Sequence, residues 1–229
     1  MAESLPTAVV LLGGSPWLEW DFNTSSTIRD LAPSRIDRPG KRSIHILAYP
    51  IDVPCNYQKI IDITQRIWSG DGLVSGNQGN DDTRDLKPAF ALHMGMRSSN
   101  PGFCVETFAR RDGYCELGDE GDSFPSELFE TGGLWEGFPS KLYSDLNVPQ
   151  VTSTVSRMVP GVDITVSDNC GLYFCEFELF ATLAELRRQN LPGKAVFLHV
   201  PTDKRPEAIQ LGVRVVEAIV QAIVDNHEV

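Results

Sequence analysis

The chain has 229 residues, of which 41% are hydrophobic, so it is long enough to bury one sizeable core. It carries 31 acidic against 20 basic residues, and this excess of negative charge argues against a nucleic-acid partner, which would need clustered Lys and Arg. The longest early apolar run, residues 8–12, is too short for a signal peptide or a membrane span. We therefore expect one domain over residues 1–229, without a nucleic-acid or membrane partner.

Strand and helix patterns alternate along the chain. Short apolar runs rich in β-branched and aromatic residues predict strands at 8–12, 43–51, 88–95, 103–109 and 194–200. Helical patterns cover 25–31, 56–68, 172–189 and the segment that begins at Pro206. Such alternation predicts an α/β fold, a three-layer α/β/α sandwich around a mixed, largely parallel sheet.

Two other segments lack a clear period. Residues 69–87 are polar and Gly-rich, which predicts a long surface loop. Residues 110–150 are rich in Gly, Glu, Ser and Pro, and they predict no definite element. In the last segment, by contrast, Val213, Val216, Val220 and Ile223 recur at three- and four-residue steps, so we expect an amphipathic helix packed on the sheet.

The five cysteines stand at positions 55, 104, 115, 170 and 175. Their odd number, and the absence of a C-x-x-C pair, favour free thiols in a reducing compartment, so we expect a cytoplasmic protein. The four histidines show no H-E-x-x-H spacing, and the chain has no glycine-rich phosphate loop. We therefore expect neither a metal nor a cofactor.

Two segments near the C-terminus each place a reactive side chain at the end of an expected element. In SDNCGLYFCEFELF, Cys175 lies near the start of a helix, after the residues Ser167, Asp168 and Asn169, which are good N-caps. In KAVFLHVP, His199 ends a strand. Because a helix N-terminus and a neighbouring imidazolium both lower a thiol pKa, the pair predicts a Cys/His peptidase or amidase.

In such an enzyme the histidine takes the thiol proton and later returns it to the leaving amine. The backbone N–H of Cys175 is the expected donor to the oxyanion of the intermediate. His93 is another histidine in a strand pattern, and we expect a structural role for it.

These two segments resemble the signature of type I pyroglutamyl peptidases, cysteine exopeptidases that remove an N-terminal pyroglutamate from peptides. The S-x-x-A-G-x-[YF]-x-C stretch of that family is matched by Ser167, Gly171, Tyr173 and Cys175, with Cys170 in place of the alanine. The F-[IV]-H-V-P stretch is matched by Phe197, His199, Val200 and Pro201. Weaker likeness extends over nearly the whole chain.

The resemblance implies further site residues. Glu106 matches the acidic residue that orients the catalytic histidine, and Gly95 matches the glycine of an H-x-G segment upstream of it. The residues expected to line the substrate pocket are Gly14, Trp17, Met96, Tyr173 and Phe174. Gly14 stands where the family has a phenylalanine, so one aromatic wall is absent or comes from elsewhere. The expected partner is a peptide with a blocked N-terminus, and no oligomeric state is indicated.

Two further positions depart from the family pattern. Arg110 stands where Asn is usual, and Glu176 stands where Asn or Asp is usual. The altered loop around Gly14 keeps two alternatives open. One is a related hydrolase with a different N-terminal specificity. The other is a non-catalytic homologue that binds peptide termini or a protein partner, since a fold alone does not fix a function.

Overall fold

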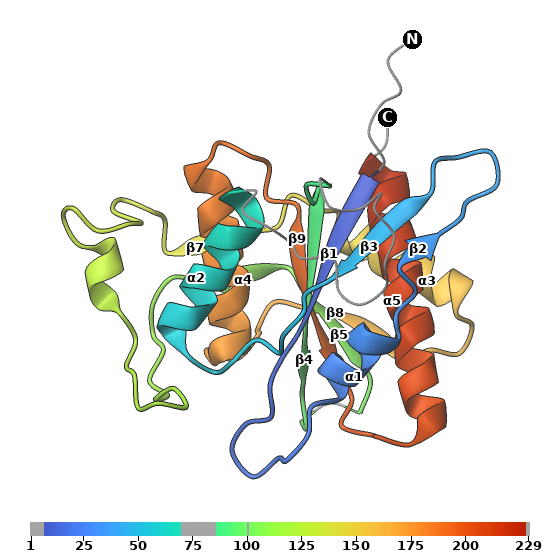
Figure 1. Ribbon diagram of the computed structural model, residues 1–229, viewed down its shortest axis with the longest axis horizontal. Coiled ribbons are helices and arrows are strands. Elements are labelled where there is room, and N and C mark those ends of the chain that lie inside the picture. Colours follow the sequence, from blue (N-terminus) through green and yellow to red (C-terminus); the bar gives the residue numbers. More distant parts are fainter. Residues whose placement is uncertain (1–6, 70–85, 100, 228–229) are drawn as a thin grey trace.

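The computed structural model describes residues 7–69, 86–99 and 101–227. The loop expected at 69–87 lies almost entirely outside the described residues. Within them, strands and helices alternate as the sequence predicts, and they form a single-domain α/β fold (Figure 1).

A seven-stranded sheet forms the centre of the molecule, in the order β2-β3-β1-β4-β9-β5-β8. Its strands are β1 (Thr7–Gly13), β2 (Arg35–Ile36), β3 (Ile44–Ala48), β4 (Phe90–Met96), β5 (Phe103–Glu106), β8 (Ile164–Ser167) and β9 (Ala195–Val200). The pairs β1–β3, β1–β4, β4–β9 and β5–β8 are parallel, whereas β2–β3 and β5–β9 are antiparallel. The predicted mixed, largely parallel sheet is confirmed.

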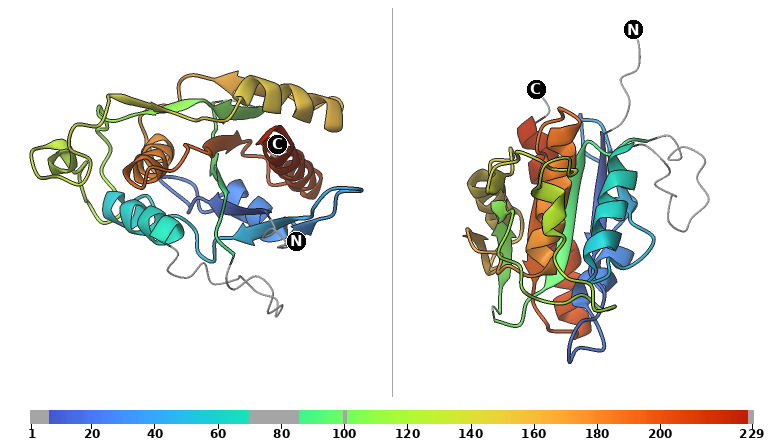
Figure 2. Two further views of the ribbon diagram at one scale, coloured as in Figure 1. Left: turned by 90° about the horizontal axis from the view of Figure 1, so that it is seen from above. Right: turned by 90° about the vertical axis from the view of Figure 1, so that its left-hand side faces the viewer.

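Helices cover both faces of this sheet (Figure 2). One face carries α2 (Tyr57–Ser69) and α4 (Phe174–Arg188), and the other carries α1 (Thr24–Leu31), α3 (Val148–Met158) and α5 (Pro206–His227). The valines predicted to face the sheet from α5 are all buried there. None of the helices in the described ranges is long and apolar enough to cross a membrane.

Alternation along each strand divides the core into two layers. On β1, Val9 and Leu11 pack with the α1, α3 and α5 side, whereas Val10 and Leu12 pack with the α2 and α4 side. The same period of two places Phe197 on the α2 and α4 side. His199, two residues further along β9, therefore projects from that same face.

A long connection from Arg111 to Ser140 packs outside α2 and α4 (Figure 1). It contains the short 3-10 helix η2 (Ser126–Phe129), and it is flanked by a separate two-stranded sheet of β6 (Phe108–Arg110) and β7 (Lys141–Tyr143). The single strand predicted over 103–109 is therefore wrong in detail. Its first part belongs to the large sheet and its second part to the small one.

Candidate active site

Three neighbouring strands place the predicted site residues side by side. On β4 and β9, Gly95 is the register partner of His199, so both project from the same face. On β5, Glu106 is the register partner of Phe197, which projects from that face as well. Gly95 and His199 lie near the ends of β4 and β9, under the N-terminus of α4, whereas Glu106 ends the antiparallel β5 beside Phe197 and reaches His199 from there.

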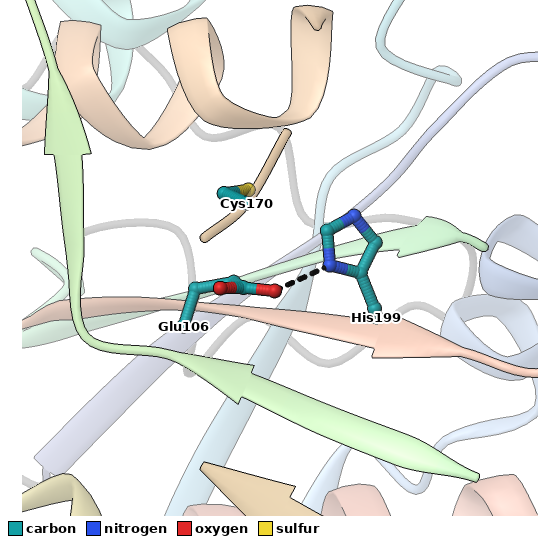
Figure 3. A group of neighbouring side chains, drawn as sticks. All are labelled: Glu106, Cys170 and His199. Carbon is teal, nitrogen blue, oxygen red and sulfur yellow. Dashed lines mark hydrogen bonds and ion pairs between the residues drawn. The ribbon is translucent and has the colours of Figure 1, made fainter. Parts of the chain in front are cut away.

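His199 and Glu106 form a buried pair (Figure 3). The histidine Nδ1 lies 2.8 Å from Glu106 Oε1, and the carboxylate is 0% exposed. If Nδ1 carries the proton it donates to this carboxylate, which leaves Nε2 free to act as a base. The guanidinium of Arg97 lies 3.3 Å from the same Glu106 oxygen. The predicted orienting role of Glu106 thus has the required geometry.

Cys175 occupies the first turn of α4, directly above β4. A methyl group added at Gly95 would lie 2.9 Å from Cys175 Sγ and 2.8 Å from Phe197 Cζ. The glycine therefore leaves the space that the thiol fills, on the strand next to His199. Within the described residues no hydrogen bond joins Cys175 to His199, although both line one cavity.

The N-terminus of α4 is open towards this cavity. Its N-cap is Tyr173, which makes no side-chain capping bond, so Ser167, Asp168 and Asn169 do not cap the helix as predicted. The backbone N–H groups of Glu176 and Phe177 both donate hydrogen bonds to the Tyr173 carbonyl. The N–H of Cys175 belongs to the first turn, where a helix offers no acceptor of its own, and it is available to an oxyanion.

The thiol pKa differs from the sequence-based expectation. Burial raises the pKa of Cys175 well above its ordinary value, and the neighbouring Glu178, Cys55 and Glu106 raise it further. The backbone N–H of Cys175 lowers the pKa again, but it does not offset the effect of burial. A shift in this direction favours the neutral thiol, and His199 is the base placed in the same cavity to take its proton.

A second thiol, Cys170, lies even closer to the pair. Donor atoms of Cys170, Glu106 and His199 all lie within 4.8 Å of one another (Figure 3). Burial raises the pKa of Cys170 well above its ordinary value as well. These three side chains have the donor types to hold a zinc ion. Sequence spacing did not reveal the group, because its members come from β5, β9 and the loop before α4.

The cavity in front of the site has a volume of about 380 Å³. All five residues predicted to line the substrate pocket do line it: Gly14, Trp17, Met96, Tyr173 and Phe174. The Trp17 ring meets the rings of Tyr173 and Phe174 edge to face, with centroids 5.7 Å apart in both pairs. Aromatic walls therefore come from Trp17 and the N-terminus of α4.

The two departures from the family pattern, Arg110 and Glu176, form one interacting pair. The Arg110 Nε and Nη2 atoms each donate to the fully buried Glu176 carboxylate at 2.7 Å. The same carboxylate accepts the backbone N–H of Leu172 at 2.8 Å. Glu176 therefore points away from the Cys175 thiol and holds the turn that precedes it.

His93 is fully buried between α4 and β9. Its Nδ1 lies 2.6 Å from Glu178 Oε1, and its Nε2 lies 2.9 Å from Thr182 Oγ1. Both ring nitrogens are thus occupied, which agrees with the predicted structural role. Sequence reasoning did not single out Glu178, which lines the cavity one helical turn after Cys175.

A thiol that shares a cavity with a histidine, which is itself held by a buried carboxylate, meets the requirements of nucleophilic acyl transfer. On this ground the site is that of a cysteine hydrolase. Residues 80–225, more than half of the chain, match the family model described as pyroglutamyl peptidase. The chain belongs to this family, which consists of cysteine omega-peptidases.

Relatives and solved structures agree with this membership. Human pyroglutamyl-peptidase 1 is 23% identical over 220 residues, which cover 95% of this chain and 90% of that protein. The pyrrolidone carboxyl peptidase of Pyrococcus furiosus superposes with a TM-score of 0.73 at 15% identity, over 96% of this chain and 99% of that one. The enzyme from Thermococcus litoralis gives 0.71 at 18%, over 97% and 95%. At such identities these structures establish the fold alone.

Proposed function

We propose that this protein is a cysteine exopeptidase that removes an N-terminal pyroglutamyl residue from peptides. The observation that carries the proposal is the cavity itself. It brings Cys175 and His199 together, backed by the buried Glu106, under aromatic walls that suit a small flat ring. Membership of the pyroglutamyl peptidase family supports the same activity, and the human relative shares most of the chain length.

The chemistry follows from the assigned groups. His199 Nε2 takes the proton of Cys175, and the sulfur attacks the carbonyl carbon of the N-terminal residue. The tetrahedral intermediate places its negative oxygen near the Cys175 N–H. His199 then protonates the leaving amine, and the shortened peptide departs from a thioester. Water that gives its proton to His199 hydrolyses the thioester, which releases the free acid and restores the thiol.

The blocked N-terminus of the substrate and the cytoplasmic location belong to this proposal. The location is supported by the five cysteines, which are all free thiols. A related hydrolase with a different N-terminal specificity is the second candidate. The glycine at position 14, where the family has a phenylalanine, favours it.

The test is the turnover of three fluorogenic amides that differ only in the N-terminal residue: pyroglutamyl, prolyl and alanyl. We expect hydrolysis of the pyroglutamyl amide and little of the others. Turnover of the prolyl or alanyl amide alone would favour the second candidate, and turnover of none, with active control enzyme in the same assay, would contradict a peptidase.

A further inference from the structure

Glu178 is a nearly buried carboxylate that lines an otherwise mostly apolar cavity. It is 5% exposed, and it shares the cavity lining with Met94, Phe174 and Phe197. Residues three apart lie on the same side of a helix, so Glu178 faces the cavity from α4 next to Cys175. A carboxylate is rarely placed in such surroundings without a partner, because burying a charge costs free energy unless it is hydrogen-bonded.

His93 is the hydrogen-bond partner of one of the two Glu178 carboxylate oxygens. Its Nδ1 lies 2.6 Å from Glu178 Oε1, and Thr182 Oγ1 lies 2.9 Å from its Nε2. When the Thr182 hydroxyl donates to Nε2, Nδ1 carries the proton and donates to the carboxylate. His93 is 0% exposed, so this arrangement fixes the Glu178 side chain from behind. The other oxygen, Oε2, makes no hydrogen bond within the described residues.

A carboxylate oxygen can only accept a hydrogen bond. A ligand that packs against Glu178 in the cavity must therefore present an N–H or O–H group, or leave Oε2 without a partner. Leaving it without a partner costs affinity, whereas a hydrogen bond to a charged acceptor is among the stronger ones. The ring of a pyroglutamyl residue has one donor, its lactam N–H. The ring of an N-terminal prolyl residue has a secondary ammonium.

We propose that Glu178, held by His93, selects N-terminal residues whose small ring carries an N–H donor. This inference rests on the proposed function, because it takes the cavity as the site of the N-terminal residue. Glu178 is thus a specificity residue, and it rejects rings in which the nitrogen is methylated or replaced by carbon. The shared chemistry is the ring N–H, and the lactam and the ammonium are its two sources.

Binding of free rings tests the proposal without turnover. Dissociation constants of 2-pyrrolidone, N-methyl-2-pyrrolidone and the pyrrolidinium ion would be measured by NMR titration of the parent protein. We expect N-methyl-2-pyrrolidone to bind about tenfold to hundredfold more weakly than 2-pyrrolidone, the range of one hydrogen bond to a charged group. Equal binding of these two rings, or binding of none of the three, would overturn the proposal.

Variants then locate the effect. In Glu178→Gln the amide oxygen can keep the bond to His93, which turns an NH₂ donor towards the cavity, so we expect the preference for the N–H ring to disappear. Glu185→Gln is the matched control, because Glu185 is buried on the same helix but binds Arg188 outside the cavity. It should keep the preference. The same preference in both variants would contradict the role of Glu178, and the parent comparison holds even if Glu178→Gln does not fold.

The outcomes also separate this inference from the proposed function. Tighter binding of the lactam than of the pyrrolidinium ion supports both. Tighter binding of the pyrrolidinium ion supports the role of Glu178 and contradicts the pyroglutamyl assignment. The protein could prefer the N–H ring and yet fail to hydrolyse the pyroglutamyl amide. That result would support the role of Glu178 and contradict the proposed reaction.

Discussion

Cys175 and Cys170 are two thiols that face one histidine, and their surroundings differ. Cys170 lies within 4.8 Å of the Glu106 and His199 donor atoms, but it precedes the helix. Cys175 lies in the first turn of α4, where its own N–H can bind an oxyanion, and it lines the cavity next to Glu178. Acyl transfer needs both a base and an oxyanion donor, so the geometry favours Cys175 as nucleophile.

Replacing each thiol by alanine separates the two roles. We expect Cys175→Ala to abolish hydrolysis of the pyroglutamyl amide and to change the thermal midpoint by only a few degrees, since one sulfur atom contributes little packing. Cys170→Ala should keep most of the activity. Steady-state rates and thermal unfolding curves of both variants check this, and the reverse order of activities would assign the nucleophile to Cys170.

The raised pKa of Cys175 predicts how its alkylation depends on pH. Only the thiolate reacts with iodoacetamide, and burial disfavours the thiolate. Modification of Cys175 should therefore be slow at pH 7 and should still be accelerating above pH about 8.5, the value of an ordinary thiol. Mass spectrometry of the labelled peptides would follow it, with the exposed Cys115 as internal comparison. A rate that is already constant between pH 6 and 8 would instead show a preformed thiolate–imidazolium pair.

The role of Gly95 can be tested by adding a methyl group there, because the structure has no room for one. The methyl of Gly95→Ala would lie 2.9 Å from Cys175 Sγ and 2.8 Å from Phe197 Cζ, closer than such atoms approach. The thiol must then move away from its place beside His199. Because a misplacement of about 1 Å can cost on the order of 100-fold in rate, we expect kcat to fall by at least about tenfold. A double variant with Cys175→Ala should regain part of any lost stability, and full activity of Gly95→Ala would show that the thiol works from another position.

Much of this residue-scale picture could be predicted from the sequence. The two motifs identified Cys175, His199 and Glu106, and the H-x-G spacing identified Gly95. The raised thiol pKa could not be predicted, since it depends on burial and on carboxylates from other turns. Glu178 also escaped detection, because a single Glu in a helix is usually a solvated residue.

At the scale of elements, the turn before α4 is held by a contact with β6. Burial alone would raise the pKa of Glu176, but its hydrogen bonds with Arg110 and with the Leu172 and Arg110 N–H groups lower it below the ordinary value. A lowered folded-state pKa stabilises the protein above the unfolded value of about 4.3. This contribution is lost as the pH falls through the folded value.

The Arg110→Ala variant measures how much the Arg110–Glu176 pair stabilises the protein. It leaves the Glu176 carboxylate buried without its cation, and breaking a buried pair in this way costs about 3–5 kcal/mol. We expect the thermal midpoint at pH 7 to drop by about 10 °C and kcat to fall, since the Leu172 turn loosens. Arg35→Ala is the control, because Arg35 and its partner Asp37 are both exposed. An unchanged midpoint in Arg110→Ala would mean that water satisfies Glu176.

The helices and strands differ in how well the sequence pattern predicts them. The central strands and α2, α4 and α5 were predicted within a few residues, because their apolar periods are strong. The helix α3 and the strand β8 were missed. The residues of β8 are mostly half-buried or exposed, so no clear alternation marks it, and α3 begins in the Pro-rich stretch read as irregular.

At the scale of the whole molecule, the connection from Arg111 to Ser140 has little regular structure of its own and is fixed by long-range packing. Trp135 is 0% exposed, and its ring packs against Phe129, Phe177 and Phe180. Two of these partners belong to α4, the helix that carries Cys175 and Glu178. Such contacts have no periodic signature, which is why the segment could not be predicted from its sequence.

Trp135→Ala should therefore loosen the whole α4 side of the molecule. Truncating a fully buried Trp costs about 3–5 kcal/mol, because the cavity left behind only partly collapses. For a chain of this length we expect the thermal midpoint to fall by about 10 °C or more. Leu117→Ala is the control, since Leu117 lies in the same connection but is 61% exposed, and it should change the midpoint by no more than a degree or two. Below the new midpoint, Trp135→Ala should retain the Glu106–His199 pair while α4 becomes more mobile, because the ring partners of Trp135 lie on η2 and α4. Hydrogen exchange would then show faster opening of α4 than of β9, and equal protection of both elements would mean that the connection does not support the helix.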